Sequence, residues 1–384
     1  CILDLINRED EQRVPLLLHN YTTYFMLAIP TSRTVTLDEG EKITLACTGN
    51  HNYLTSNDFV LANSNYTCAT CVGGKRLRVF RKTIDFDSIV CHKPIKGEIR
   101  KTRNQCADGK GNITEIGYQV TRIHWVTLIK VCYDDWLGVT YYTEHILHGS
   151  EINNKSKNNA RPGFSIAGLG PQIAASVSYQ KVFQKNTFDR LFGSAKDAEN
   201  YINSKSYLVK GHLSPGADFI VSSSQRSTYF YINTCPEWQS INGGNWKSVE
   251  TNIRKSAGEY KRDFKIITGT YGVLSLPDIN HNPIKIYLSS GNKLPVPELI
   301  WKIMYDEKLE LGIVFVSINN PFLRTIAPVC TNVCNEYGWG HTNWNDFSRG
   351  YVYCCKVDEF VKKVKGVIPS LRVGGVLPQT PQII

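Results

Sequence analysis

The sequence has no long apolar run. Its most hydrophobic stretch, around Ile313 to Ile318, is far shorter than the ~20 residues that a membrane-spanning helix needs. We therefore interpret that stretch as a buried strand and expect no membrane partner. No segment has the low hydrophobicity that is typical of disorder, and there is no internal repeat or low-complexity tract. With 384 residues, 42% of them hydrophobic, the chain can bury the core of two domains or of one large domain.

Acidic side chains are also relatively scarce. The chain has 34 of them against 44 basic ones, which gives a formal net charge of +10. This balance favours a polyanionic partner, because lysine and arginine release counterions when they neutralise phosphates. Many secreted basic proteins never bind nucleic acid, so charge alone does not decide the function.

The cysteines and the glycosylation sequons point to the secretory pathway. There are 12 cysteines, an even number, and four Asn-x-Ser/Thr sequons, at Asn20, Asn65, Asn112 and Asn154. Any sequon that carries a glycan must face solvent. The chain begins at Cys1 without an initiator methionine, and we interpret it as a mature secreted chain whose signal peptide was removed or omitted.

The spacing of the cysteines leaves several pairings open. Cys68-x-x-Cys71 fits half of a zinc site or a redox pair, but no second such motif or nearby histidine pair completes a zinc site, so we favour disulfides. Seven cysteines precede residue 150 and five follow it. If all twelve pair within the chain, at least one disulfide must join the two portions. The adjacent Cys354 and Cys355 should pair with two different partners.

Strand and helix patterns indicate two domains of α+β class. Residues 1–115 show short alternating runs broken by Gly, Asn and Asp, which predict a β-rich, cysteine-containing domain. Residues 116–384 begin with longer β-rich runs and continue with mixed α and β signals. We predict helices over Ala195–Ser204, capped by Ser194, over Trp246–Ala257, and over Pro297–Tyr305, with the proline in its first turn. Phe219–Ser222 and Thr228–Asn233 are predicted to be extended.

The most informative stretch begins with KGHLSPGADF at Lys210 and continues as YINTCPEWQSINGGNW. Hydrolysis of a phosphodiester requires a base for water, a cation at the phosphate and help for the leaving oxygen. A neutral imidazole such as that of His212 can be the base. The amide oxygens of Asn233 and Asn242 suit a hard divalent ion that retains most of its waters.

The predicted helix after Gly243-Gly244 adds a carboxylate and a guanidinium. Trp246, Glu250 and Arg254 are four residues apart and therefore share one stripe of the helix. A solitary histidine is more often structural, and a Glu/Arg pair at this spacing is more often a surface ion pair. Here the histidine, the two asparagines and the Glu/Arg stripe occur in one order within 45 residues. The combination favours a catalytic site. Asp218 is either a further metal-shell group or a cap.

This block resembles the DNA/RNA non-specific endonuclease family, the ββα-metal nucleases that include endonuclease G. The family signature is Asp-Arg-Gly-His, followed by an Asn-rich segment and a helix that bears Glu and Arg. Its Gly-His corresponds to Gly211 and His212, while Lys210 replaces its arginine and Val209 its aspartate. KGHLSPGADF and INGGNW are most similar to extracellular arthropod nucleases, a group that includes digestive double-stranded nucleases. The resemblance is dense over residues 205–255, looser over 118–375, and absent from 1–115.

The resemblance implies a ββα-metal core with a mixed or antiparallel sheet, and a role for each matched residue. His212 would activate water. Asn242 would bind Mg²⁺ directly, with Mn²⁺ or Ca²⁺ as substitutes, and Glu250 would bind it through water. Asn233 would support the site, Arg254 would stabilise the phosphate, and Lys210 would supply positive charge without the guanidinium fork. The substrate would be DNA, RNA or both, and the products would carry 5′-phosphates.

Two other functions compete with this one. The first is a secreted nucleic-acid-binding paralogue that has lost catalysis, which the presence of His212, Asn242 and Glu250 disfavours. The second is a glycan-binding module in residues 1–115, which a truncated chain that still cut at full rate would favour. No segment resembles a base-reading helix, so we expect weak sequence preference.

Overall fold

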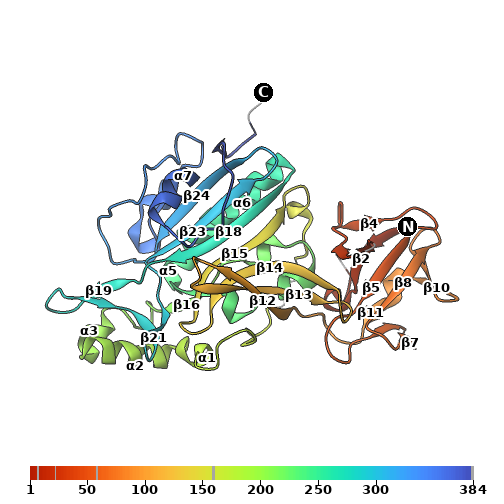
Figure 1. The fold of residues 1–384 in the computed structure, drawn as a ribbon, viewed down its shortest axis with the longest axis horizontal. Helices are drawn as coiled ribbons and strands as arrows, with labels where there is room; N and C mark the ends of the chain where they lie inside the picture. The colour runs from red at the N-terminus through yellow and green to blue at the C-terminus, as the bar shows by residue number, and fades with distance from the viewer. Residues whose placement is uncertain (7, 22, 58, 158–160, 382–384) are drawn as a thin grey trace.

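A computed structural model describes residues 1–6, 8–21, 23–57, 59–157 and 161–381 of the chain. It has a small N-terminal group of β-strands beside a larger part that contains a long, twisted sheet and the α-helices (Figure 1). Both parts are rich in strands, and the helices belong to the second part, so the predicted α+β class is confirmed. In the described residues no helix is long and apolar enough to cross a membrane.

Three small antiparallel sheets form the N-terminal β module, which we define as residues 1–91. They pair β1 with β4, order six strands as β10-β9-β8-β5-β2-β3, and order three as β11-β6-β7. The strands are β1 (Ile2–Asp4), β2 (Leu16–Asn20), β3 (Phe25–Leu27), β4 (Thr34–Thr36), β5 (Lys42–Ala46), β6 (Leu54–Ser56), β7 (Phe59–Ala62), β8 (Tyr66–Cys71), β9 (Arg76–Val79), β10 (Lys82–Asp85) and β11 (Ile89–Cys91).

A nine-stranded sheet forms the framework of the remaining chain. Its order is β12-β13-β14-β15-β18-β23-β24-β25, with β26 parallel to β24 and every other pair antiparallel. The strands are β12 (Glu98–Cys106), β13 (Gly111–Gln119), β14 (Trp125–Asp134), β15 (Val139–His148), β18 (Asp263–Tyr271), β23 (Leu299–Asp306), β24 (Leu311–Ile318), β25 (Val352–Cys355) and β26 (Gly375–Val376). Short ribbons pair β16 (Leu208–His212) with β17 (Thr234–Trp238), β19 (Ser275–Pro277) with β20 (Pro283–Lys285), and β21 (Tyr287–Ser289) with β22 (Lys293–Pro295).

The two longest helices outside the α1–α3 group cover opposite faces of this sheet. The α-helices are α1 (Ala175–Ser178), α2 (Lys181–Phe192), α3 (Ala195–Glu199), α4 (Ser222–Arg226), α5 (Gln239–Asn242), α6 (Asn245–Tyr260) and α7 (Val357–Lys363). Helix α6 packs in the same core as Ile266 of β18, whereas α7 packs in the core that contains its neighbour Ile267. Successive strand residues point to opposite faces, so the central strands are buried on both sides.

Burial on both sides explains one wrong prediction. The segment Pro297–Tyr305, predicted as a helix, instead forms most of β23 (Leu299–Asp306), whose eight residues are all buried between the two layers. A continuous apolar run of this length fits a doubly buried strand as well as a helix, and its pairing with β18 and β24 decides. The predicted extended segments are also partly helical, because Ser222–Arg226 forms α4 and Tyr231–Asn233 a 3₁₀ turn.

Two other helix predictions are confirmed. Helix α6 contains the whole of the predicted Trp246–Ala257. Helix α3 is shorter than predicted, and the Ser194 hydroxyl accepts a hydrogen bond from the Asp197 backbone N–H at 3.2 Å. This bond is the expected cap, since the first turn of a helix leaves its N–H groups without intrahelical partners.

The predicted boundary between residues 115 and 116 lies within β13. Strands β12 and β13 pair with each other and with β14, so residues from Glu98 onward belong to the large sheet. The division into two domains stays a prediction, and we propose that its boundary lies between Cys91 and Glu98.

Ten of the cysteines form disulfides, each within one portion of the chain. The pairs are Cys1–Cys71, Cys47–Cys91, Cys106–Cys132, Cys330–Cys355 and Cys334–Cys354. Cys68 and Cys235 are unpaired, so the condition that all twelve cysteines pair is not met, and no disulfide joins the two portions. Cys71 bonds to Cys1, not to Cys68, and Cys354 and Cys355 have different partners, as predicted.

The sequons differ in accessibility. Asn20 and Asn112 are exposed, as a glycan requires. Asn65 and Asn154 are half-buried, and their side-chain amides donate to the Val120 carbonyl at 3.3 Å and to Glu151 Oε2 at 3.2 Å. Glycans are therefore easier to accommodate at the first two positions.

Reduction is expected to destabilise the protein. The disulfides close loops of 20 to 70 residues, and losing a native disulfide from a small secreted domain typically costs about 2–5 kcal/mol. Thermal unfolding with and without dithiothreitol should show a large drop in Tm under reducing conditions. An unchanged Tm, with all thiols shown to be free, would contradict a structural role for the disulfides.

Candidate active site

The β16–β17 ribbon holds His212. In its antiparallel register Gly211 lies opposite Cys235 and His212 opposite Thr234. A Cβ atom on Gly211 would lie 2.2 Å from Glu237 Oε2 and 2.9 Å from Glu237 Cβ, so a larger residue before the histidine would have to displace the buried Glu237. Glu237 is 1% exposed, and both its carboxylate oxygens lack hydrogen-bond partners among the described residues. Burial, and then the nearby charge of Glu250, raise the pKa of Glu237 well above its usual range.

Asn242 ends the short helix α5, and two glycines connect it to α6. A Cβ on Gly244 would lie 2.2 Å from the Ser240 carbonyl oxygen, so the tight connection requires glycine. The side-chain amide of Asn245 then donates to the carbonyls of Asn343 and Gly350, both at 2.7 Å. These bonds fix the start of α6 against the C-terminal part of the chain. Because only two glycines separate Asn242 from α6, they also help to fix the position of Asn242.

A pocket of about 450 Å³ brings three of the predicted site residues together: Lys210, His212 and Asn242. The rest of its lining comprises Arg161, Pro162, Phe164, Gly216, Ala217, Gln225, Arg226 and Tyr229. Asn233, Glu250 and Arg254 do not line this pocket. Two arginines that sequence reasoning missed, at positions 161 and 226, therefore join Lys210 around the histidine.

His212 has the properties of a neutral base. Its Nε2 atom is buried and has no hydrogen-bond partner among the described residues. The rings of Phe164 and Tyr229 lie 4.9 and 5.0 Å from the imidazole, measured between centroids. Burial first, and then the charges of Arg161 and Lys210, lower the pKa of His212 to about 4. The ring is therefore uncharged at neutral pH and able to accept a proton.

The low pKa of His212 makes folding depend on pH. The pKa of His212 is about 4 in the folded protein and 6.5 in the unfolded chain. Between pH 6.5 and pH 4 the unfolded chain therefore binds more protons than the folded protein, and stability is lost as the pH falls. The loss from pH 7 to pH 4 is on the order of 3 kcal/mol. Urea unfolding at both pH values should show a smaller loss for His212→Gln than for the wild type. Equal losses would contradict the buried, uncharged histidine.

Lys210 lies among aromatic rings. Its Nζ is 5.2, 5.8 and 5.9 Å from the ring centroids of Phe164, Tyr179 and Tyr231. Ring faces attract a cation, and a compact ammonium is held by several of them without a guanidinium fork. These rings hold the Lys210 ammonium at the position where the family signature has an arginine.

Glu250 and Arg254 lie on α6, one turn apart, in a buried group of charges. Arg254 Nη1 donates to Asp218 Oδ1 at 2.8 Å and is 4.0 Å from Glu250 Oε2, so Asp218 is its main partner. Burial raises the pKa of Glu250 to about 7, although Lys302 and Arg254 oppose the shift. Lys302 is fully buried on β23, on the strand face that points to α6.

Asp218 links Arg254 to a buried chain of hydrogen bonds. His145 bridges Asp218 Oδ2, at 3.1 Å from its Nε2, and the Ser214 hydroxyl, at 2.8 Å from its Nδ1. Burial opposes the ionisation of Asp218, but the hydrogen bond from His145 and the charge of Arg254 outweigh it and hold the pKa well below its usual range. Asp218 is therefore a carboxylate that orients Arg254.

Asn233 is hydrogen-bonded to Ser214, the residue that also bonds to His145. It is fully buried; its Nδ2 donates to the Ser214 and Thr228 carbonyls at 2.8 and 2.9 Å, and its Oδ1 accepts from the Ser214 N–H at 3.0 Å. Ser214 is two residues after His212, so these bonds tie the turn that follows His212 to the network of Asp218 and Arg254. The predicted supporting role of Asn233 agrees with this geometry and stays a prediction.

Of the residues that sequence reasoning missed, some had a detectable signal. Lys302 is the one charged residue within the apolar run LIWKIMY, and such a residue in a doubly buried strand needs partners. His145 occupies an alternating strand and Arg161 a polar loop, where neither pattern distinguishes them from ordinary residues.

The site thus consists of an antiparallel β-β ribbon followed by a helix, with a neutral histidine, an amide oxygen and several cations. The model of the DNA/RNA non-specific endonuclease family matches residues 109–360. This is more than half of the chain, and the chain belongs to that family. It is accordingly an endonuclease, as the sequence predicted.

The chain is similar to two curated proteins that are named as salivary proteins. The chain is 32% identical to the salivary endonuclease of Lutzomyia longipalpis over 306 residues, which cover 78% of this chain and 73% of that protein. It is 23% identical to salivary protein Tsal1 of Glossina morsitans morsitans, over 98% of this chain and 94% of that protein. A solved structure of the EndoG/EndoGI complex matches with a TM-score of 0.39 and 14% identity, covering 65% of this chain and 88% of that one.

Proposed function

We propose that this protein is a secreted, magnesium-dependent endonuclease that hydrolyses DNA, RNA or both, with His212 as general base and 5′-phosphate products. The observation that carries the proposal is the 450 Å³ pocket, where the uncharged His212, whose Nε2 has no partner among the described residues, meets Asn242 and three cationic side chains. The disulfides and the salivary relatives support secretion.

In this mechanism the chain's own residues bind the phosphate and move a proton. Lys210, Arg161 and Arg226 attract the phosphodiester into the pocket. His212 Nε2 accepts a proton from water that attacks the phosphorus. Asp218 holds Arg254 so that its guanidinium can stabilise the developing charge. Because the cations contact phosphates and not bases, sequence preference should be weak.

The available donors fit Mg²⁺. In the part of the chain that the structure describes, no three His, Cys, Asp or Glu residues are grouped as a metal site, which disfavours an all-protein cage for a soft metal. Asn242 offers an amide oxygen at the pocket, and Glu250 a carboxylate on α6. Magnesium typically binds to few protein oxygens and keeps several waters; it would neutralise phosphate charge and assist the leaving oxygen, with Mn²⁺ and Ca²⁺ as alternative ions.

Digestion of plasmid DNA by the pure protein tests this function. Cutting should require Mg²⁺ and stop when a chelator is added. Tight binding of DNA without any cleavage would instead identify a nucleic-acid-binding paralogue that has lost catalysis. Parallel digests of single- and double-stranded DNA and RNA at equal concentration would define the substrate.

Asn242→Ala should weaken the dependence on magnesium most strongly. Removing the amide oxygen deletes the one protein ligand that we place directly on the ion, so the Mg²⁺ concentration for half-maximal cutting should rise at least about tenfold, or about 1.4 kcal/mol of binding. Asn280→Ala, at an exposed turn, is the matched control and should titrate like the wild type. An unchanged titration for Asn242→Ala would refute its role as ligand.

A further inference from the structure

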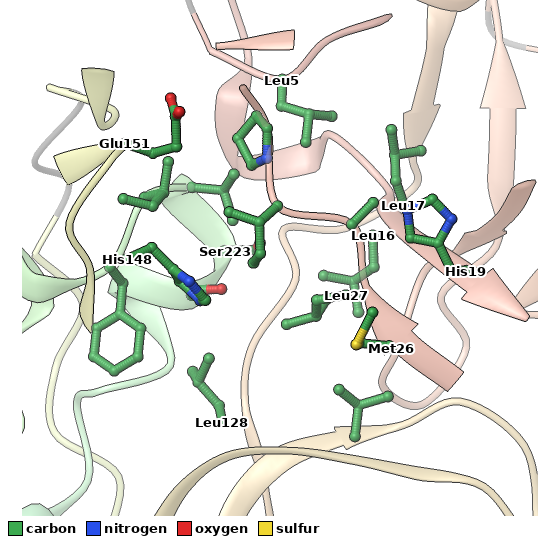
Figure 2. Close-up of a pocket in the computed structure, with 18 of the residues that line it drawn as sticks. Leu5, Leu16, Leu17, His19, Met26, Leu27, Leu128, His148, Glu151 and Ser223 are labelled. Carbon is green, nitrogen blue, oxygen red and sulfur yellow. The ribbon is translucent and has the colours of Figure 1, made fainter. Parts of the chain in front are cut away.

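A second and larger cavity lies between the N-terminal β module and the large sheet. It has a volume of about 780 Å³, within the range of small-molecule sites in proteins. Figure 2 shows Leu16 and Leu27 of the module on one side of it, and Leu128 of β14 with Ser223 of α4 on the others. His212 and Asn242 are not part of its lining, so it is separate from the candidate active site.

Exposed apolar side chains gather around this cavity. Tyr24, Met26, Ile29 and Ile146 are 52%, 47%, 38% and 37% exposed, and all four line it. Large exposed hydrophobic residues that are scattered singly need no explanation, but a group around one hollow marks a binding site. The cavity therefore offers apolar surface that a ligand could cover.

The charges of the lining restrict the ligand. No lysine or arginine is among the described residues that line the cavity, although the chain has 44 of them. Its carboxylates are already engaged. Glu151 accepts from the Ser32 N–H at 2.8 Å, Asp263 lies 2.9 Å from His148 Nδ1, and Glu11 bonds to the Ser156 hydroxyl. Among the described lining residues, an anionic head group would find no lysine or arginine, and a cationic one would find each carboxylate already bonded, and burying an unpaired charge is costly.

We propose that this cavity binds a small uncharged molecule with an apolar chain or ring and at most a hydroxyl as its polar group. Apolar side chains supply most of the contact, and serine hydroxyls such as that of Ser223 lie on the α4 wall. Nucleic acid fits this cavity poorly, because the described lining residues include no lysine or arginine to neutralise phosphate. The ligand would contact both the module and the sheet, and therefore stabilise the folded arrangement of the two.

Three ten-carbon probes that differ in the charge of the head group test whether the cavity prefers an uncharged ligand. Isothermal titration of the full-length protein at pH 7.5 compares an uncharged, an anionic and a cationic head group. The probes are 1-decanol below its solubility limit, and decanoate and decylamine below their critical micelle concentrations. Decanol should bind saturably, with one molecule per chain, at least about tenfold more tightly than the other two. No saturable binding of decanol, or equal binding of all three, would overturn the proposal.

Substitutions at the rim locate the site. Met26→Arg and Ile29→Arg place a charge in the apolar lining at exposed positions, so the fold should tolerate them, and each should weaken decanol binding at least about tenfold. Phe59→Arg is the matched control, since Phe59 is 75% exposed and outside the lining. If either rim variant has a wild-type circular dichroism spectrum and wild-type decanol affinity, the assignment is wrong. Plasmid cutting by the same samples reports separately on the nuclease site.

Discussion

Replacing His212 by alanine should lower kcat by about 10²–10⁴-fold, the usual contribution of a general base. The imidazole is uncharged at neutral pH, its Nε2 has no partner among the described residues, and it lines the pocket that also contains Asn242. Because the loss is in proton transfer and not in phosphate binding, KM should change little. Single-turnover cleavage of a fluorescent duplex under saturating Mg²⁺ measures the effect.

The control for this variant is His281→Asn. His281 is exposed, at a turn with a φ of 64°, a conformation that asparagine tolerates. It should cut at the wild-type rate. A His212→Ala variant with a native spectrum and wild-type turnover would remove His212 as the base, whatever the result at the control position.

Replacing Asp218 by alanine should lower the free energy of unfolding by about 3–5 kcal/mol, the usual cost of removing one partner of a buried ion pair. The Asp218 side chain is 3% exposed and that of Arg254 is 14% exposed, so the guanidinium would lose its main counter-ion away from bulk water. His145 would lose a hydrogen-bond partner at the same time. Urea unfolding at pH 7 measures the loss, and cleavage should fall as Arg254 moves.

An exposed ion pair provides the comparison. Asp87→Ala removes the partner of Lys75, where both side chains are more than 40% exposed, and should cost less than about 1 kcal/mol. Asp218→Asn should fall between the two, since it keeps the shape and some hydrogen bonds but not the charge. A loss below 1 kcal/mol for Asp218→Ala would contradict the buried network.

The site residues could be proposed from the sequence because their order along the chain reflects local structure. Gly211 and His212 follow the apolar start of a strand, and Glu250 and Arg254 are four residues apart on a helix that formed as predicted. Short-range geometry of this kind depends on backbone periodicity alone. The matching family model then confirmed the resemblance on which the individual roles were based.

Partners from distant segments were not predictable in this way. The Glu/Arg spacing suggested a direct pair, but Asp218, 36 residues away, lies closer to Arg254 than Glu250 does. The sequence pattern predicts Asp218 only as a metal-shell group or a cap, and nothing in it distinguishes His145. Which carboxylate meets a helical arginine depends on how the turn after His212 packs against α6, and no periodicity encodes that contact.

For the cysteines and for β23 as well, the sequence predicted part of the result and contacts between distant segments decided the rest. That most cysteines form disulfides was predictable from their number and the sequons, but Cys68 and Cys235 stay unpaired because pairing requires Cα atoms a few ångströms apart. The run LIWKIMY was recognisably buried, yet only its pairing with β18 and β24 made it a strand.

By itself, then, the sequence determined the nuclease family, the α+β class and the histidine, asparagine and Glu/Arg positions of the candidate site, because these depend on residue type and local spacing. The tertiary structure alone decided that Arg161 and Arg226 join Lys210 at the pocket, that Asp218 holds Arg254, and that an apolar cavity separates the N-terminal β module from the sheet. Those features arise from contacts between segments far apart in the chain, and they form only when the layers pack.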